Sequence, residues 1–123
     1  MSGFVHLHCH TTWSLLDGAI PAESLPHVAA ALGFEAVAMT DHDSLLGAVR
    51  FSKACRAAGI KPIFGAELTL DNGHVTAIAR NERGYANLCR LISGAHLSNE
   101  RGMPQTTFEA VAAHSEGLFV LSG

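Results

Sequence analysis

Three histidines, His6, His8 and His10, alternate with other residues near the start of the chain. Alternate side chains of a β-strand point to the same face, so a strand over Phe4–His10 would place the three imidazoles on one side, about 6.6 Å apart along the strand. Two imidazoles at that spacing can bind one divalent ion at about 2.0–2.1 Å, or two neighbouring ions. The pattern favours a metal site over a histidine ladder on an exposed strand or a core histidine bonded to the backbone. Cys9 would face the other way.

Further candidate ligands follow other predicted strands. His42 lies just past a short apolar strand predicted over Ala36–Thr40, and Glu67 lies in the later part of a strand predicted over Pro62–Leu70. In α/β proteins, functional side chains gather at the carboxyl ends of the strands. Three successive strands therefore place ligand-type residues at one rim. We would not expect this coincidence if these polar residues only formed a solvent-exposed surface.

Composition narrows the class of protein. The 123 residues are enough for one small domain or for part of a larger one. A net charge of −3 and a pI near 6.2 argue against a freestanding nucleic-acid-binding protein. No apolar run reaches about 18 residues and no signal-peptide pattern is present, so we expect a cytoplasmic protein without a membrane partner. Cys9, Cys55 and Cys89 are odd in number and widely spaced, which fits reduced thiols.

Helices are predicted between the strands. The first ends at Leu32, before a glycine, and begins either at Pro21 or after a cap at Ser24. The second is capped by Asp43 or Ser44 and reaches residue 58. Alternating strands and helices predict an α/β fold with a mostly parallel sheet and right-handed crossovers.

The second half of the chain starts with a hairpin signal. The Asn72-Gly73 turn should fold His74–Ala79 back onto the preceding strand. Asn81 can cap the next helix, and Thr106 begins a capping-box pattern before a short helix that leads to a strand at 118–121. The predicted buried stripe of the longer helix is Tyr85, Leu88, Cys89 and Ile92.

Several of these segments resemble a known family. His8-Cys9-His10-Thr11, Thr40-Asp41-His42 and Gly65-Ala66-Glu67 are similar to the metal motifs of the PHP (polymerase and histidinol phosphatase) superfamily. The closer resemblance is to the N-terminal PHP domain of bacterial DNA polymerase III alpha subunits, replicative or error-prone, and it extends over nearly the whole chain. It includes Ser14-Leu15-Leu16-Asp17-Gly18 and Gly84-Tyr85-Ala86-Asn87-Leu88.

This resemblance implies a fold and a ligand set. PHP domains are distorted (β/α)7 barrels, so residues 1–123 would be the N-terminal portion of one, an incomplete barrel of about four βα units plus a β-hairpin. Up to three divalent ions would be held in a complete site, and Glu67 is placed to bridge two of them. A set of nitrogen and oxygen ligands without thiolate suits Zn, Mn or Fe. The ligands implied are His8, His10, Asp17, His42, Glu67 and His74.

Other roles remain open at this point. Asp17 precedes a glycine and can be an ordinary turn aspartate, and His74 can be an exposed hairpin residue. His6 is expected to orient a ligand and not to bind metal, and Asp41 to support the site or to cap a helix.

The resemblance also implies a function for the intact protein. It would be a DNA-directed DNA polymerase whose PHP site hydrolyses phosphodiester bonds as a metal-dependent 3′–5′ exonuclease, with DNA and other replication or repair polymerase subunits as partners. The fragment itself would be inactive, because the family's later ligands would lie outside it. One alternative is a metal-stabilised scaffold without catalysis, and another is a freestanding small-molecule phosphatase of the histidinol-phosphate type.

Overall fold

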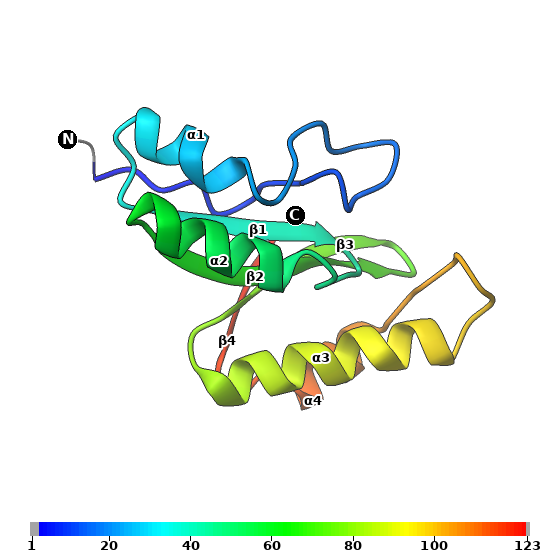
Figure 1. The fold of residues 1–123 in the computed structure, drawn as a ribbon. Helices are drawn as coiled ribbons and strands as arrows, with labels where there is room; N and C mark the ends of the chain where they lie inside the picture. The colour runs from blue at the N-terminus through cyan, green and yellow to red at the C-terminus, as the bar shows by residue number, and fades with distance from the viewer. Residues whose placement is uncertain (1–2, 123) are drawn as a thin grey trace.

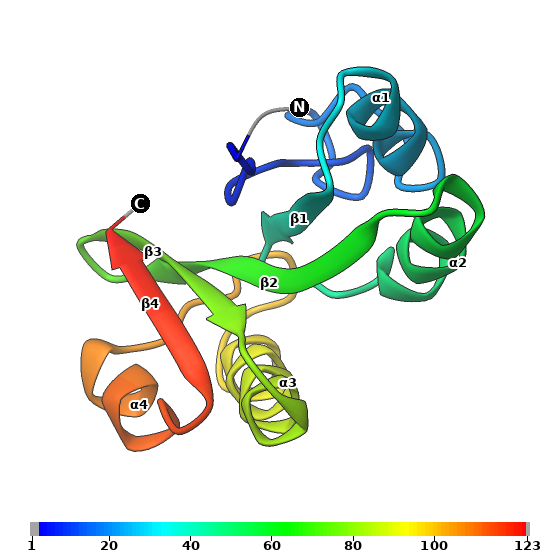
Figure 2. The same ribbon diagram turned by 90° about the vertical axis from the view of Figure 1, so that its left-hand side faces the viewer.

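The computed structural model describes residues 3–122, which form a mixed α/β fold around one four-stranded sheet (Figures 1 and 2). The strand order is β1-β2-β3-β4, with β1 parallel to β2 and the other two pairs antiparallel. The expected mostly parallel sheet is therefore wrong, because a tight turn joins β2 to β3 and β4 returns beside β3. The strands are β1 (Ala36–His42), β2 (Lys61–Leu70), β3 (Gly73–Ala79) and β4 (Leu118–Ser122).

The helices all cover one face of the curved sheet (Figure 2). They are α1 (Leu25–Ala31), α2 (Ala48–Ala58), α3 (Glu82–Leu97) and α4 (Phe108–Ala113). We call this face the outer face and the opposite one the inner face. Met39 pairs with Phe64 and Asp41 with Ala66 between the parallel strands, so these side chains point to the outer face. The alternate residues of each strand, including Glu67 of β2, point to the inner face.

Two apolar clusters hold the helices on the outer face. The first joins α1 and α2 to β1 and includes Met39 and Phe51, both fully buried. The second joins α3 and α4 to the other strands and includes Leu68 and Leu88, also fully buried. Each such side chain contributes about 1.5–3 kcal/mol relative to leaving it in water. These clusters fix the sheet on which the polar rim is built.

The N-terminal segment lies along β1 but is not a strand, contrary to the prediction for Phe4–His10. The N–H of Ala38 donates to the His6 carbonyl at 3.0 Å, and that of Thr40 donates to the Cys9 carbonyl at 2.8 Å. Between these two hydrogen bonds the segment advances by three residues, whereas β1 advances by two. A regular ladder of hydrogen bonds between the segment and β1 therefore cannot form. The Thr40 hydroxyl accepts from the Cys9 N–H at 2.9 Å instead.

Two of the predicted helix starts are confirmed. Asn81 caps α3, its side chain accepting from the Gly84 N–H at 2.9 Å. A Cβ at Gly84 would overlap the Gly117 carbonyl oxygen, so this close approach requires glycine. Ser24, one of the two starts left open, occupies the N-cap position of α1. Pro26 then lies in the first turn, where its missing N–H costs no helical hydrogen bond.

Two other predicted caps are wrong. Gly47, and neither Asp43 nor Ser44, precedes α2, and Thr107 caps α4 by accepting from Ala110. Asp43 has a positive φ of 46°, and its carboxylate accepts from the Thr69 N–H and hydroxyl at 2.8 and 2.6 Å. It therefore joins the end of β1 to β2. In α3 the buried residues are Gly84, Leu88, Leu91 and Ala95, while Tyr85, Cys89 and Ile92 of the predicted stripe are half-buried.

The inner face is partly apolar and, within residues 3–122, no helix covers it. A cavity of about 500 Å³ there is bordered by Leu7, Ile63, Ile78, Phe119 and Leu121. The side chain of Phe119 is 52% exposed. No helix in the described part of the chain combines the length and apolar character needed to cross a bilayer.

Candidate metal centre

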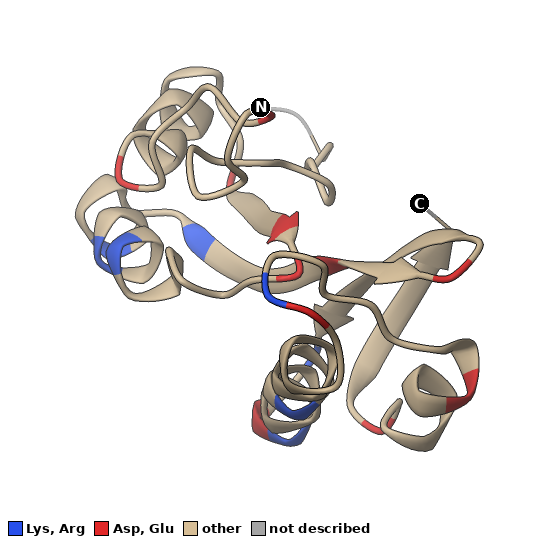
Figure 3. Cartoon of the chain, turned by 90° about the vertical axis from the view of Figure 1, so that its right-hand side faces the viewer, with Lys and Arg blue, Asp and Glu red and all other residues tan. Residues whose placement is uncertain are grey.

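The site lies where β1 and β2 end. His42 and Glu67 are register partners in this parallel pair, so both side chains leave the sheet on the inner face at the same edge. His42 Nδ1 lies 2.7 Å from Glu67 Oε2. Acidic positions, drawn red in Figure 3, gather at these strand ends. Glu67 is buried, and Lys61 is the only other charged residue of β2.

The N-terminal segment brings two imidazoles to Glu67. His8 Nε2 and His10 Nε2 lie 2.6 and 3.1 Å from the same oxygen, Oε1. The hydrogen bonds of His6 and Cys9 to β1 hold the segment in place. Cys9 packs against the core of α1 and α2, so it faces away from the two histidines as expected.

The loop after this segment returns Asp17 to the same place. Asp17 Oδ2 lies 2.7 Å from His10 Nδ1 and 2.6 Å from His42 Nε2. His10 and His42 each therefore contact Asp17 with one ring nitrogen and Glu67 with the other. Five of the six ligands implied by the resemblance meet in one connected cluster, which we call the rim cluster: His8, His10, Asp17, His42 and Glu67.

Asp41 holds the loop that carries Asp17. Its carboxylate accepts from the Thr11 N–H at 2.6 Å, the Thr11 hydroxyl at 2.8 Å and the Ser14 hydroxyl at 2.7 Å, and it is 1% exposed. The Ser14 carbonyl in turn accepts from the N–H groups of Asp17 and Gly18. A Cβ at Gly18 would overlap the Thr11 backbone, so the tight return of the loop depends on glycine. Asp41 is thus a supporting residue, as predicted.

The environment keeps both carboxylates of the cluster ionised. The hydrogen bond from His42 is the main reason why the pKa of Asp17 is lowered, and the charges of His10 and His42 add to it. Burial raises the pKa of Glu67, but the hydrogen bond from His8 and the charges of His42, His74 and His10 outweigh burial and lower it overall. Two carboxylates that stay anionic side by side favour a cation between them.

Hydrogen bonding among these residues alone does not satisfy the cluster. A neutral imidazole has one N–H and one lone pair. His10 and His42 each contact a carboxylate oxygen with both nitrogens, so one contact of each neutral ring sets a lone pair against a lone pair. Protonating both rings would place two positive charges on rings whose centroids are 4.2 Å apart. A divalent cation resolves this conflict, because it accepts lone pairs from both ligand types.

The ligand atoms form two overlapping groups that fit such an ion. One contains His8, His10 and Glu67, the other His10, Asp17 and His42, and within each group the ligand atoms lie within 4.8 Å of one another. Nitrogen and oxygen ligands without sulfur suit Zn, Mn or Fe. Glu67 presents Oε1 to His8 and His10 and Oε2 to His42, an arrangement that suits a carboxylate shared by two ions.

Two histidines lie apart from the rim cluster. His74 pairs with Thr69 across the hairpin and is exposed, and it reaches Glu67 only through its charge. His6 was expected to orient a ligand, but its ring packs against Phe4 and Phe34, at 4.8 and 5.2 Å between centroids. It makes no hydrogen bond to the rim cluster within residues 3–122.

Sequence reasoning missed one polar residue beside the cluster. Thr76 pairs with Glu67 across β2 and β3, is 1% exposed, and its hydroxyl has no hydrogen-bond partner in the described part of the chain. A buried hydroxyl without a partner costs about 1–3 kcal/mol. In the sequence, the only indication of its place was that Thr76 follows His74 by two residues and so lies on the same face of the strand.

Comparison with known families decides the relationship. Residues 6–123 match the family described as the PHP domain. The chain belongs to the PHP domain family. The match includes every residue of the rim cluster.

Relatives with similar sequences are DNA polymerases. The chain is 44% identical to the error-prone DNA polymerase of Symbiobacterium thermophilum over 98% of its length, and 42% identical to the DNA polymerase III subunit alpha of Treponema pallidum over 97%. It spans 13% and 12% of those two proteins. The predicted relationship to the PHP domains of this polymerase family is therefore confirmed, for a segment about an eighth of the relatives' length.

Solved structures support the PHP fold. A two-domain protein from Bacteroides vulgatus, containing a predicted PHP-like metal-dependent phosphoesterase, matches 94% of the chain with a TM-score of 0.61 and 17% identity, and the match covers 33% of that protein. A Bifidobacterium adolescentis structure assigned to the metal-dependent phosphoesterases matches 92% of the chain with a TM-score of 0.56 and 24% identity, over 44% of its own length. The four-stranded sheet with its outer helices is thus part of a PHP-type fold.

Proposed function

We propose that this chain forms part of the PHP domain of a DNA polymerase of the DNA polymerase III alpha type. In the complete protein, the PHP site would hydrolyse phosphodiester bonds at a DNA 3′ end. The observation that carries the proposal is the rim cluster, in which three imidazoles and two anionic carboxylates surround one position at contacts of 2.6–3.1 Å. The polymerase relatives supply the substrate class, DNA.

The residues of the cluster would divide the work. His8 and Glu67 would hold one ion and Asp17 and His42 a second, His10 would complete one of the two groups, and His74 would be a further ligand. Divalent ions bound there supply water activation and neutralise phosphate charge. The chain's own contribution is to fix the ligands: Asp41 holds the loop of Asp17, and the register of β1 with β2 holds His42 beside Glu67.

The setting follows from the same relatives. We propose DNA and other polymerase subunits as partners of the complete protein, in replication or repair, and the cytoplasm as its location. Cys9, Cys55 and Cys89 are free thiols, which suits a reducing compartment.

The test is Glu67→Gln in the complete polymerase. This change keeps the shape of the side chain but removes the charge that two neighbouring ions share. We expect 3′ exonuclease activity to fall by about 100-fold or more, since removing even a residue that supports a ligand costs 10–100-fold. Primer extension should stay within about twofold, because polymerisation needs carboxylates outside this chain.

A matched control separates loss of the ligand from loss of a charge. Glu109 is exposed on α4, far along the chain from the rim cluster, and Glu109→Gln makes the same chemical change. It should leave both activities unchanged. If Glu67→Gln also leaves exonuclease activity unchanged, the site is structural and the PHP domain is a metal-stabilised scaffold.

A further inference from the structure

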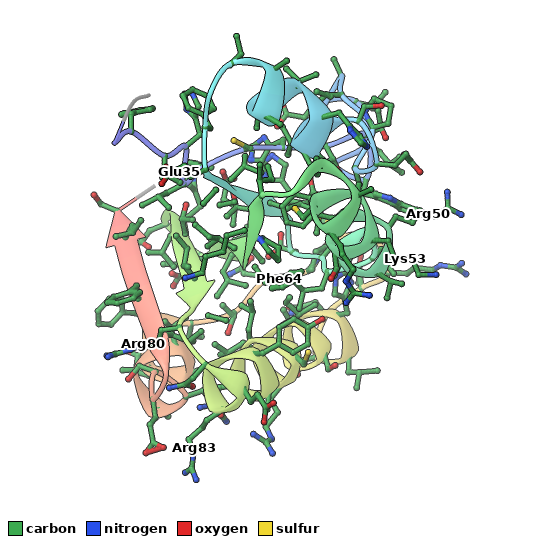
Figure 4. All side chains as sticks on the ribbon, turned by 60° about the vertical axis from the view of Figure 1, so that its left-hand side comes forward. Glu35, Arg50, Lys53, Phe64, Arg80 and Arg83 are labelled. Carbon is green, nitrogen blue, oxygen red and sulfur yellow. The ribbon has the colours of Figure 1, made fainter. Side chains whose placement is uncertain are left out.

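A second feature lies on the outer face, near the opposite end of β2 from the rim cluster. Helices α2 and α3 border a cavity of about 630 Å³, which we call the outer groove. Its floor includes Phe64 and Tyr85. Figure 4 shows Phe64 between the two helices, with Lys53 extending from α2 and Arg80 on the other side. Basic side chains lining the groove are Lys53, Arg56, Lys61 and Arg80.

The charge of this groove is opposite to that of the chain. The whole chain has eight Lys and Arg residues and a net charge of −3, yet four of the eight line the groove beside a single carboxylate, Glu82. None of the four forms an ion pair within residues 3–122, and Arg80 instead stacks over the Phe119 ring at 5.0 Å. The flanking Arg50 and Arg83, by contrast, pair with Glu23 and Glu116 at 3.5 and 2.8 Å. Unpaired cations around a cavity attract an anionic partner.

The floor of the groove is aromatic and firmly anchored. Phe51, which is fully buried, packs edge-to-face with Phe64 at 5.9 Å, and Phe64 packs in the same way with Tyr85 at 5.9 Å. The Tyr85 hydroxyl has no hydrogen-bond partner in the described part of the chain. Burial raises the pKa of Tyr85, so the hydroxyl remains a donor at neutral pH. A rigid aromatic ring with a free donor thus lies among unpaired cations.

We propose that the outer groove binds single-stranded nucleic acid, with phosphates at the four cations and a base against Tyr85. Lys53 and Arg56 are three residues apart on one face of α2. Arg80 lines the groove just after β3, with its guanidinium over the Phe119 ring at 5.0 Å. Positive grooves with aromatic floors bind single strands in this way, because phosphates and bases alternate along the ligand. An acidic peptide would use the cations but not the aromatic floor.

This inference goes beyond the proposed function and does not depend on it. Phe64 points to the outer face and Glu67 to the inner face, so a strand in the groove would not contact the rim cluster. Binding should therefore persist without metal. Its failure would leave the metal site untouched, and failure of the metal site would leave the groove intact.

The direct test is fluorescence anisotropy of a labelled 12-nucleotide oligothymidylate titrated with the 123-residue chain in EDTA, under conditions in which circular dichroism shows that the metal-free chain is folded. We expect a dissociation constant of about 10⁻⁴ to 10⁻⁶ M at moderate salt. The plot of log affinity against log salt should have a slope of about −2 to −3, since three to four phosphate contacts each contribute about 0.7 for a single strand. No binding up to about 10⁻³ M at low salt would overturn the proposal.

Charge reversal locates the binding. Lys53→Glu with Arg56→Glu should weaken binding at least about tenfold and reduce the salt slope by about 1–2. The matched control is Arg90→Glu with Arg101→Glu, two exposed cations outside the groove, which changes the net charge by the same amount. Its effect should stay within about threefold. Equal losses in both double variants would mean that only overall charge matters and would overturn the assignment.

A second comparison tests the aromatic floor. An abasic 12-mer should bind about fivefold or more weakly than oligothymidylate, since stacking of one base is worth about 1–3 kcal/mol. Tyr85→Leu, which retains an apolar side chain against Phe64, should abolish that difference; circular dichroism checks its fold. If a polyglutamate peptide instead displaces the oligonucleotide at equal charge concentration, the groove is a site for an acidic protein segment and the proposal is wrong.

Discussion

The two ends of β2 carry opposite kinds of incomplete site. At its carboxyl end, the imidazoles and carboxylates of the rim cluster contact one another at 2.6–3.1 Å, yet their lone pairs face each other. At its beginning, the cations of the outer groove form no ion pair with a carboxylate within residues 3–122. The first arrangement favours a cation and the second an anion. One strand thus positions both sites, on opposite faces, and each can be disrupted without the other.

The largest effect should follow removal of two imidazoles from the rim cluster. His8→Ala with His10→Ala deletes ligands from both overlapping groups, so bound metal should be lost almost completely. Metal bound only to the folded chain at about 100 times its dissociation constant adds about 2.7 kcal/mol, so the melting temperature should fall by roughly 10 °C. Elemental analysis and thermal melting measure the two effects.

The control for this variant removes two other histidines. His27→Ala with His114→Ala changes side chains that lie on α1 and after α4, away from the cluster. It should retain metal. Equal metal loss in both double variants would remove the distinction between the rim cluster and the other histidines.

The next effect concerns the residue that supports the loop of Asp17. Asp41→Asn replaces one acceptor oxygen with an NH2 group, which faces a donor whichever way the amide turns. At the Oδ2 position it faces the Thr11 hydroxyl, and at the Oδ1 position it faces the Thr11 N–H and the Ser14 hydroxyl. We expect a stability loss of about 1–3 kcal/mol and metal affinity lower by 10–100-fold. Urea unfolding without metal and a competitive Zn titration separate the two. Unchanged metal affinity would mean that Asp17 does not depend on this loop.

The inner face should produce a smaller effect that depends on concentration. Phe119 and Leu121 are 52% and 38% exposed beside the sheet edge at β4, so the isolated chain should be marginally stable or should associate. Phe119→Lys should shift light scattering toward monomer, whereas Leu97→Lys, at the exposed end of α3, should not. A monodisperse monomer melting cooperatively above about 65 °C would contradict this expectation.

Acid stability should show the smallest effect. The folded chain lowers the pKa of Asp17 and Glu67, so the unfolded chain takes up protons first as pH falls. Their contribution is fully present above the ordinary carboxyl pKa of about 4 and is lost as pH falls through the folded value. The urea concentration at the unfolding midpoint of the metal-free chain should therefore decrease as the pH falls below about 4. The decrease should be smaller for Glu67→Gln. Identical pH profiles would show that Glu67 gains nothing from its histidine neighbours.

The sequence predicted the parts of the fold that local signals determine. The Asn72-Gly73 turn specifies the hairpin, and Asn81 starts α3, because these residues act within three or four positions of themselves. The convergence of His42 and Glu67 also followed, since parallel strand ends share an edge. His8 and His10 join them on a segment that lies along β1 without forming a strand. The role of Asp17 came from the family resemblance, and the loop bonded to Asp41 explains it.

The remaining features depend on contacts between distant residues. The segment before Thr11 fails to form a strand because it advances three residues for two of β1, a register that alternation alone does not reveal. Asp43 was predicted to cap a helix but reaches Thr69, 26 residues away, from a positive-φ backbone. His6 alternates with His8 but packs on Phe34, because the segment does not keep the period of a strand.

Metal content per chain shows most plainly whether the rim cluster binds divalent metal. The 123-residue chain would be purified without added metal, dialysed against Zn or Mn, and analysed for metal per chain, with Glu67→Gln measured alongside. We expect about one ion or more per chain for the native sequence and a clear reduction for Glu67→Gln. Less than about 0.2 ion per chain, unrecovered after adding either metal, would contradict it.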